Sequence, residues 1–237
     1  MTAALVVVDM QEDFCPPNGS LAVTGARDLA PTINALLAHP GFTFRVSSQD
    51  YHPRTHISFA SNHPAPNNQP FSSTITLTNP APGKHGETKP QRLWPVHCVA
   101  DTPGAALIPE LDASRIDLFV KKGMDERVEM YSVFADAFGN RPDPALHARS
   151  VDYDLEGELR ARGVTKVFAV GVAGDYCVKC TAVDAARAGF ESFLVEDATR
   201  CVDPGEGWEE AKRELRQAGV RIVKSDGPEV RGLMEGV

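Results

Sequence analysis

The chain has 237 residues, ordinary proportions of apolar and charged side chains, and a formal net charge of -8. The excess of negative charge disfavours binding to nucleic acid or to an anionic membrane, because both attract positively charged surfaces. The five cysteines are an odd number at irregular spacing, which favours a reducing compartment over a disulfide framework, and we expect a cytoplasmic protein.

Six short apolar runs predict β-strands, at residues 3–8, 42–46, 118–120, 167–172, 193–195 and 221–223. The first run has no basic segment before it and is too short for a signal sequence or a membrane span. Most runs are continuous rather than alternating, as in strands buried on both faces of a parallel sheet. Helical periodicity appears at residues 29–37, 155–162, 178–188 and 208–218. We therefore predict a single α/β domain over residues 1–237, with a three-layer α/β/α architecture and a mainly parallel six-stranded sheet.

The segment from about residue 51 to 109 has neither the apolar runs of strands nor the periodicity of helices, and it is rich in Pro, Asn, Ser, Thr and His. Long irregular stretches in compact domains are usually functional. We interpret this segment as a long insertion that forms a lid, a subunit interface, or both. A homo-oligomer is therefore one expected form of the protein.

Four of the predicted strands are followed by side chains that can act as acids, bases, nucleophiles or metal ligands: Asp9, Asp50 with His52, Lys122, and Cys177. Ligands of open parallel sheets bind beyond the carboxyl ends of the strands, where these residues would meet. Each has an ordinary explanation when taken alone, because aspartate often forms turns, lysine is usually a surface charge and cysteine is often a packing residue. Their convergence instead predicts the site of a cysteine hydrolase.

The three residue types have complementary roles in such a site. Cys177 would be the nucleophile, and its place at a strand-to-helix turn exposes it to the positive end of a helix, which lowers a thiol pKa. Lys122 would stabilise the thiolate. Asp9 would take and return protons, a role that requires a pKa raised by partial burial.

A second group of residues has the chemistry of a metal site. Asp50, His52 and His97 offer one carboxylate and two imidazoles, which suit Zn, Fe or Mn. The alternative is that His52 is a turn residue and His97 a hydrogen-bonded core residue. Cys177 and Cys180 form a Cys-X-X-Cys pair, but the sequence has no second such pair that could complete a zinc site. We interpret the remaining cysteines as small packing residues: Cys15, Cys98, Cys180 and Cys201.

Five motifs occur in order along the chain: Val7-Val-Asp-Met-Gln-Glu-Asp-Phe14, Asp50-Tyr-His-Pro53, Leu93-Trp-Pro-Val-His97, Lys122-Gly123 and Gly171-Val-Ala-Gly-Asp-Tyr-Cys177. With them the sequence resembles the isochorismatase-like hydrolases, and the nicotinamidases among these, over nearly its whole length. The Asp-X-His and Trp-Pro-X-His motifs favour the nicotinamidases, because the broader superfamily commonly lacks them. The resemblance implies the isochorismatase-like hydrolase fold.

The resemblance also implies roles for individual residues. The catalytic triad would be Asp9, Lys122 and Cys177. One divalent metal ion, Zn with Fe or Mn as alternatives, would be held by Asp50, His52 and His97. A cis peptide would join Val172 to Ala173, and the backbone N–H groups of Ala173 and Cys177 would form an oxyanion hole. Phe14 and Trp94 would flank an aromatic substrate. His56 and Glu129 are further candidates for the metal shell.

The implied reaction is hydrolysis of nicotinamide to nicotinate and ammonia through a thioester on Cys177, with the metal ion at the pyridine nitrogen. Pyrazinamide is an expected second substrate, and the product would feed NAD salvage. Two other functions remain open: the same triad acting on another amide or a ureido compound, and a non-catalytic protein that binds a ligand or a metal. A redox role for Cys177 and Cys180 is a third.

Overall fold

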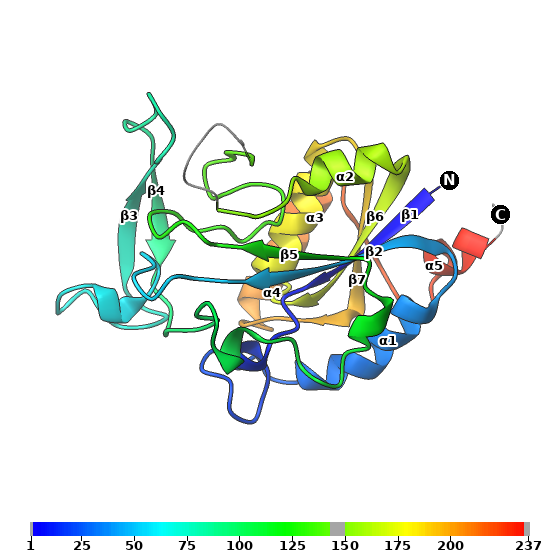
Figure 1. The fold of residues 1–237 in the computed structure, drawn as a ribbon, viewed down its shortest axis with the longest axis horizontal. Coiled ribbons are helices and arrows are strands. Elements are labelled where there is room, and N and C mark those ends of the chain that lie inside the picture. Colours follow the sequence, from blue (N-terminus) through cyan, green and yellow to red (C-terminus); the bar gives the residue numbers. More distant parts are fainter. Residues whose placement is uncertain (1, 143–149, 235–237) are drawn as a thin grey trace.

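The structure is a computed structural model that describes residues 2–142 and 150–234. A six-stranded sheet runs through the middle of the molecule (Figure 1) in the order β5-β2-β1-β6-β7-β8. Its strands are β1 (Thr2–Val8), β2 (Phe42–Asp50), β5 (Leu118–Lys122), β6 (Val164–Val172), β7 (Glu191–Arg200) and β8 (Arg221–Val223). Every neighbouring pair is parallel. All six predicted strands are therefore confirmed, and the sheet is wholly rather than mainly parallel.

Helices cover both faces of the sheet, as the continuous apolar strands require. They are α1 (Ala30–Ala38), α2 (Leu155–Ala161), α3 (Cys177–Arg187), α4 (Glu206–Gln217) and α5 (Pro228–Arg231). In β1, Leu5 and Val7 belong to the core that contains residues of α1 and α5, whereas Val6 and Val8 belong to the core under α2, α3 and α4. The three-layer α/β/α prediction is confirmed. None of the described helices is both long enough and apolar enough to cross a membrane.

The segment from residue 51 to 109 contains a hairpin that the sequence did not predict. It consists of β3 (Thr74–Thr78) and β4 (Thr88–Arg92), which pair antiparallel and form a separate two-stranded sheet. The hairpin projects beyond the end of the main sheet toward which the arrows of β2 and β5 point (Figure 1). Of its ten strand residues only Leu77 and Gln91 are buried, so the hairpin has almost no apolar signal in the sequence.

The strands β5, β2, β1 and β6 are neighbours, and each is followed by residues that the sequence analysis selected. Lys122 ends β5, Asp50 ends β2, Asp9 follows β1, and Cys177 begins the helix after β6. Because parallel strands end on the same side of a sheet, this order alone brings the four side chains to one edge.

Candidate active site

Lys122 connects Asp9 and Cys177 at the carboxyl edge of the sheet. Its Nζ lies 2.9 Å from Asp9 Oδ2 and 3.6 Å from Cys177 Sγ. Asp9 and Lys122 have no exposed surface, and Cys177 is 5% exposed. Ser48 on β2 donates a hydrogen bond of 2.7 Å to the other oxygen of Asp9. The sequence prediction that these three side chains meet agrees with this geometry.

Negative charge exceeds positive charge in this cluster, because the single ammonium of Lys122 pairs with two carboxylates, those of Asp9 and Asp50. Burial alone would lower the pKa of Lys122, but the two carboxylates more than offset it and hold the pKa well above its usual value. Burial raises the pKa of Asp9 to about 6, against the opposing effect of Lys122. Asp9 is therefore ionised at neutral pH and close to the pH at which it can return a proton, as a general acid–base group requires.

The expectation of a lowered pKa for Cys177 is wrong. Burial raises the pKa of this thiol well above its usual value, and the charge of Lys122 only partly opposes this. Asp9 and Asp50, which pair with the same lysine, raise the pKa of Cys177 further because their charges disfavour a nearby thiolate. Cys177 therefore rests as a thiol, and attack by its sulfur requires a base at the site. The carboxylate of Asp9 is near enough to be such a base, since ligand atoms of Asp9, Asp50 and Cys177 lie within 4.8 Å of one another.

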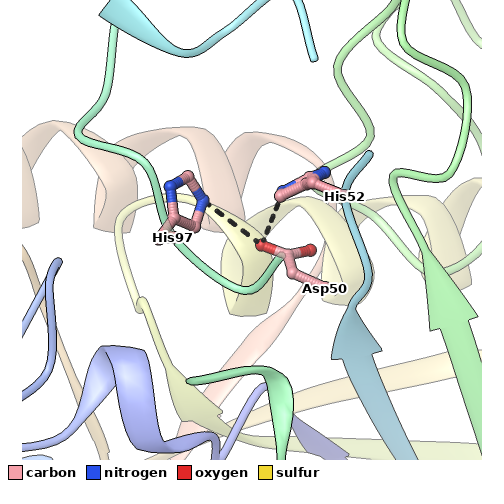
Figure 2. Close-up of side chains that lie close together, drawn as sticks. All are labelled: Asp50, His52 and His97. Atoms are coloured by element: carbon pink, nitrogen blue, oxygen red, sulfur yellow. Dashed lines mark ion pairs between the residues drawn. The ribbon is translucent and has the colours of Figure 1, made fainter. Parts of the chain in front are cut away.

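Asp50, His52 and His97 form the second group that the sequence selected (Figure 2). Asp50 Oδ2 lies 3.5 Å from His52 Nε2 and 3.9 Å from His97 Nε2, and all three side chains are buried. The Nδ1 atoms of the rings point the other way, each 2.8 Å from a main-chain carbonyl, that of Gly123 for His52 and that of Pro95 for His97.

This arrangement fits a divalent metal ion. A histidine ligand commonly donates its second ring N–H to a carbonyl, which fixes the tautomer and turns the free nitrogen toward the metal. Nε2 of His52 is fully buried and has no hydrogen-bond partner among the described residues. A buried polar atom without a partner is costly, and a metal ion would satisfy it. Burial lowers the pKa of His97 to about 4, so its imidazole is neutral, the form that binds metals.

Gly123 is necessary for the position of His52. Its φ of +68° lies in the left-handed region, which side chains other than glycine rarely adopt. A Cβ at this position would lie 2.3 Å from Cε1 of His52. Gly123 therefore makes room for the imidazole ring and also accepts its hydrogen bond.

His56 and Glu129, the two further candidates for the metal shell, lie beside His52. The rings of His56 and His52 are 4.1 Å apart, and ligand atoms of His52, His56 and Glu129 lie within 4.8 Å of one another. Both nitrogens of His56 already have partners, Ser58 Oγ at 2.8 Å and the Val128 carbonyl at 3.2 Å. His56 would have to give up one of these bonds to bind a metal. Burial raises the pKa of Glu129.

A pocket connects the two groups. Its lining includes Cys177 and Ala173 together with Asp50, His97 and Glu129. The peptide between Val172 and Ala173 is cis, as the resemblance implied. Ala173 and Cys177, the two residues expected to form the oxyanion hole, thus both border the space in which a substrate would lie.

Aromatic side chains form the walls of this pocket: Phe14, Trp94, Tyr131 and Tyr176. The rings of Trp94 and Tyr176 are 4.9 Å apart and nearly perpendicular. The hydroxyl of Tyr131 accepts a hydrogen bond of 2.9 Å from Nε1 of Trp94, which holds the indole in place. The sequence analysis selected Phe14 and Trp94 but missed both tyrosines. Tyr176 directly precedes Cys177 and could have been noticed for that reason, whereas no local pattern marks Tyr131.

Comparison with known proteins agrees with this geometry. The model of the isochorismatase domain matches residues 3–227. The chain belongs to the isochorismatase family. Among curated members, the nicotinamidase of Acinetobacter baylyi is 40% identical over 222 residues, which cover 94% of this chain and 92% of that protein.

Solved structures of relatives have the same fold as this isochorismatase-family chain. The yeast nicotinamidase Pnc1p bound to the inhibitor nicotinaldehyde superposes with a TM-score of 0.83 at 35% identity, covering 94% of this chain and 100% of that one. The pyrazinamidase of Pyrococcus horikoshii in complex with zinc superposes with a TM-score of 0.68 at 31% identity, covering 94% and 99%. The expected isochorismatase-like hydrolase fold is confirmed.

Proposed function

We propose that the protein is a nicotinamidase that hydrolyses nicotinamide to nicotinate and ammonia, with pyrazinamide as a second substrate. The observation that carries the proposal is the contact of Lys122 with Asp9 and Cys177 beside an aromatic pocket that Cys177, Asp50 and His97 all line. Full-length relatives with this activity support it, including the Acinetobacter baylyi nicotinamidase.

In the first half of the reaction Asp9 takes the proton of the Cys177 thiol, and the sulfur attacks the carboxamide carbon. The negative charge that develops on the carbonyl oxygen is stabilised by the backbone N–H groups of Ala173 and Cys177. Asp9, whose pKa is raised to about 6, then gives its proton to the departing nitrogen, so the C–N bond breaks and ammonia leaves. A thioester to Cys177 remains.

In the second half Asp9 takes a proton from a water molecule, which attacks the thioester carbon. The C–S bond breaks, the sulfur recovers a proton from Asp9, and nicotinic acid leaves and gives its carboxyl proton to water to become nicotinate. Lys122 remains charged throughout, because its pKa is held well above its usual value. Its ammonium stabilises each anionic form of Asp9 and Cys177 in turn and keeps Asp9 within reach of the reacting atoms.

Asp50, His52 and His97 would hold one divalent ion, and zinc is our first choice because a relative has been solved in complex with zinc. When bound, the ion supplies a Lewis acid for the ring nitrogen, directly or through water. The protein's own contribution is orientation. The flat walls of Trp94, Tyr176 and Phe14 fit a six-membered aromatic ring, which fixes the plane in which the carboxamide faces Cys177.

The test is ammonia release from nicotinamide, pyrazinamide and a non-aromatic amide by the zinc-loaded protein. We expect release from both aromatic amides and none in a Cys177→Ala variant. Cys180→Ala is the matched control, since Cys180 lies one turn further along α3 and does not line this pocket. No release from nicotinamide by the zinc-loaded parent would contradict the proposal and leave another amide or a ureido compound as the substrate. Equal loss in both cysteine variants would argue against Cys177 as the nucleophile.

A further inference from the structure

The side chain of Gln11 forms hydrogen bonds with both main-chain groups of Asp50, its N–H and its carbonyl. Its Oε1 accepts a hydrogen bond of 2.8 Å from the Asp50 N–H, and its Nε2 donates one of 2.8 Å to the Asp50 carbonyl. The same Nε2 donates a third bond, 2.9 Å long, to the carbonyl of Ala105. Gln11 has no exposed surface, so all three bonds are shielded from water.

These bonds to Asp50 take the place of main-chain hydrogen bonds between β1 and β2, because the pairing of the two strands ends just before Asp50. β1 and β2 pair in parallel up to Val8 and Ser48, and Asp9 N–H donates the last bond of this ladder to the Ser48 carbonyl. A continued ladder would next pair the Asp50 N–H with the Asp9 carbonyl. Asp9 instead has a φ of +52°, which turns the chain away from β2. The carboxamide of Gln11 takes the place of the missing peptide group.

Asp50 is consequently fixed on both sides of its strand. On the β5 side it is paired with Lys122, and the next residue, Tyr51, donates its N–H to the Lys122 carbonyl. On the β1 side only Gln11 bonds to its main chain in the described structure. The direction of a side chain follows from its backbone dihedral angles and rotamer, so the Gln11 bonds help to fix where the Asp50 carboxylate points.

Gln11 also bonds to the residue that carries the proposed general base. Its own N–H donates a bond of 2.8 Å to the Asp9 carbonyl. A single residue thus bonds the main chains of Asp9 and Asp50, the two carboxylates that share Lys122. Gln11 therefore connects the backbone of the proposed proton-transfer residue to that of a proposed metal ligand.

We propose that Gln11 is a positioning residue for the metal site, which sets the Asp50 carboxylate at the place where it meets His52 and His97. This inference rests on the metal site of the proposed function. Gln11 touches neither substrate nor metal in this role and acts only through Asp50. Outer partners that orient metal ligands typically contribute 10- to 100-fold to metal affinity, because a ligand that is displaced or mobile binds the ion less well.

The experiment measures the Kd for Zn²⁺ of metal-stripped protein by competition with a chromogenic chelator, together with the Tm of the stripped protein. Gln11→Met keeps the length and volume of the side chain but removes its hydrogen bonds. Gln49→Met is the matched control. Gln49 precedes Asp50 and donates to the same Ala105 carbonyl at 3.1 Å, but its side chain does not bond to Asp50.

We expect Gln11→Met to raise the Zn²⁺ Kd about 10- to 100-fold and Gln49→Met to change it by less than about threefold. A purely structural role would lower the Tm of stripped Gln11→Met but leave its Kd unchanged, and that result would overturn the inference. If Gln11→Met does not fold, Gln11→Asn, which is too short to span both groups, is judged by the same Kd criterion. A parent protein without stoichiometric Zn²⁺ binding would overturn the metal assignment itself, which is a distinguishable result.

Discussion

Asp9 and Lys122 form an ion pair from which water is excluded, with Nζ 2.9 Å from Oδ2 and no exposed surface on either side chain. A buried pair of this kind contributes little net stability compared with apolar residues, but removal of one partner leaves the other charge buried and uncompensated. In this protein two carboxylates depend on the same ammonium, because Asp50 also pairs with Lys122. The pair therefore has consequences for stability as well as for proton transfer.

Replacement of Lys122 by Met should lower the free energy of unfolding of metal-free protein by about 3–5 kcal/mol. The carboxylates of Asp9 and Asp50 would then lack a counter-charge and repel one another, with no water to screen the repulsion. Urea unfolding followed by circular dichroism in the presence of a chelator measures this loss. Lys121→Met is the control, because Lys121 lies 3.9 Å above the ring of Tyr51, a contact worth at most about 1 kcal/mol. Equal stability of the two variants would contradict the importance of the buried pair.

The pKa of Asp9, raised to about 6 by burial, predicts the acidic limb of the pH profile. Below that pH Asp9 is protonated and cannot accept the thiol proton, so kcat/KM for nicotinamide should fall about tenfold per pH unit. The Ser48 hydroxyl favours the carboxylate through its hydrogen bond and so lowers this pKa.

Ser48→Ala should therefore raise the pKa of Asp9 and move the acidic limb upward by about one pH unit, since a hydrogen bond to a charged group is worth about 1.5 kcal/mol or more. Ser47→Ala is the control, because the buried hydroxyl of Ser47 bonds to the Ser48 carbonyl and not to Asp9. A limb that moves to lower pH in Ser48→Ala, or that moves equally in both variants, would show that Asp9 does not set it.

Zinc added to metal-stripped protein should raise its Tm. At about 1,000 times the Kd a bound ligand stabilises by about 4 kcal/mol, which for a chain of this size corresponds to roughly 10 °C. His52→Ala should abolish the shift, because it removes the unpartnered Nε2. His85→Ala, on the exposed turn between β3 and β4, should retain it. Differential scanning fluorimetry gives both values, and a full zinc shift in His52→Ala would place the ion elsewhere.

Trp94→Leu should raise the KM for nicotinamide about three- to tenfold, since an aromatic contact contributes roughly 0.5–1.5 kcal/mol beyond simple burial. The kcat should change less, because in its proposed role Trp94 binds the aromatic ring and takes no part in proton transfer or in attack on the carboxamide. Phe119→Leu serves as control, since Phe119 is 41% exposed on the edge strand β5. Steady-state kinetics of ammonia release decides the matter, and an unchanged KM in Trp94→Leu would remove Trp94 from the ring-binding wall.

The fold could be predicted to the extent that burial leaves a periodic trace in the sequence. The core strand β1 is completely buried from Ala3 to Val8, so its apolar run is continuous and unambiguous. The hairpin was missed because its strands are almost wholly exposed, and because Pro90 within β4 argues against a strand. Its antiparallel pairing joins residues 10 to 18 positions apart, which apolar periodicity does not reveal.

The residues of the candidate site also differ in how far the sequence reveals them. Asp9, Lys122 and Cys177 could be predicted to meet because each follows an identifiable strand, and the topology of a parallel sheet does the rest. Tyr131 lies between β5 and α2, in a stretch whose described residues, 123–142, form no helix or strand, and its place in the pocket depends on tertiary packing alone. The raised pKa of Cys177 was also beyond the sequence, because it depends on the burial of the thiol and on the two carboxylates that share Lys122.

The position of β1 in the middle of the sheet has a consequence for folding. This strand pairs with β2, about 40 residues away, and with β6, about 160 residues away. During synthesis the first strand emerges early, but its second neighbour follows only after most of the chain has been made. Until then one fully apolar edge has no partner, which makes it prone to aggregation and to association with chaperones. Pairings this distant in sequence also predict slow folding, so the four strand ends of the active site come together late.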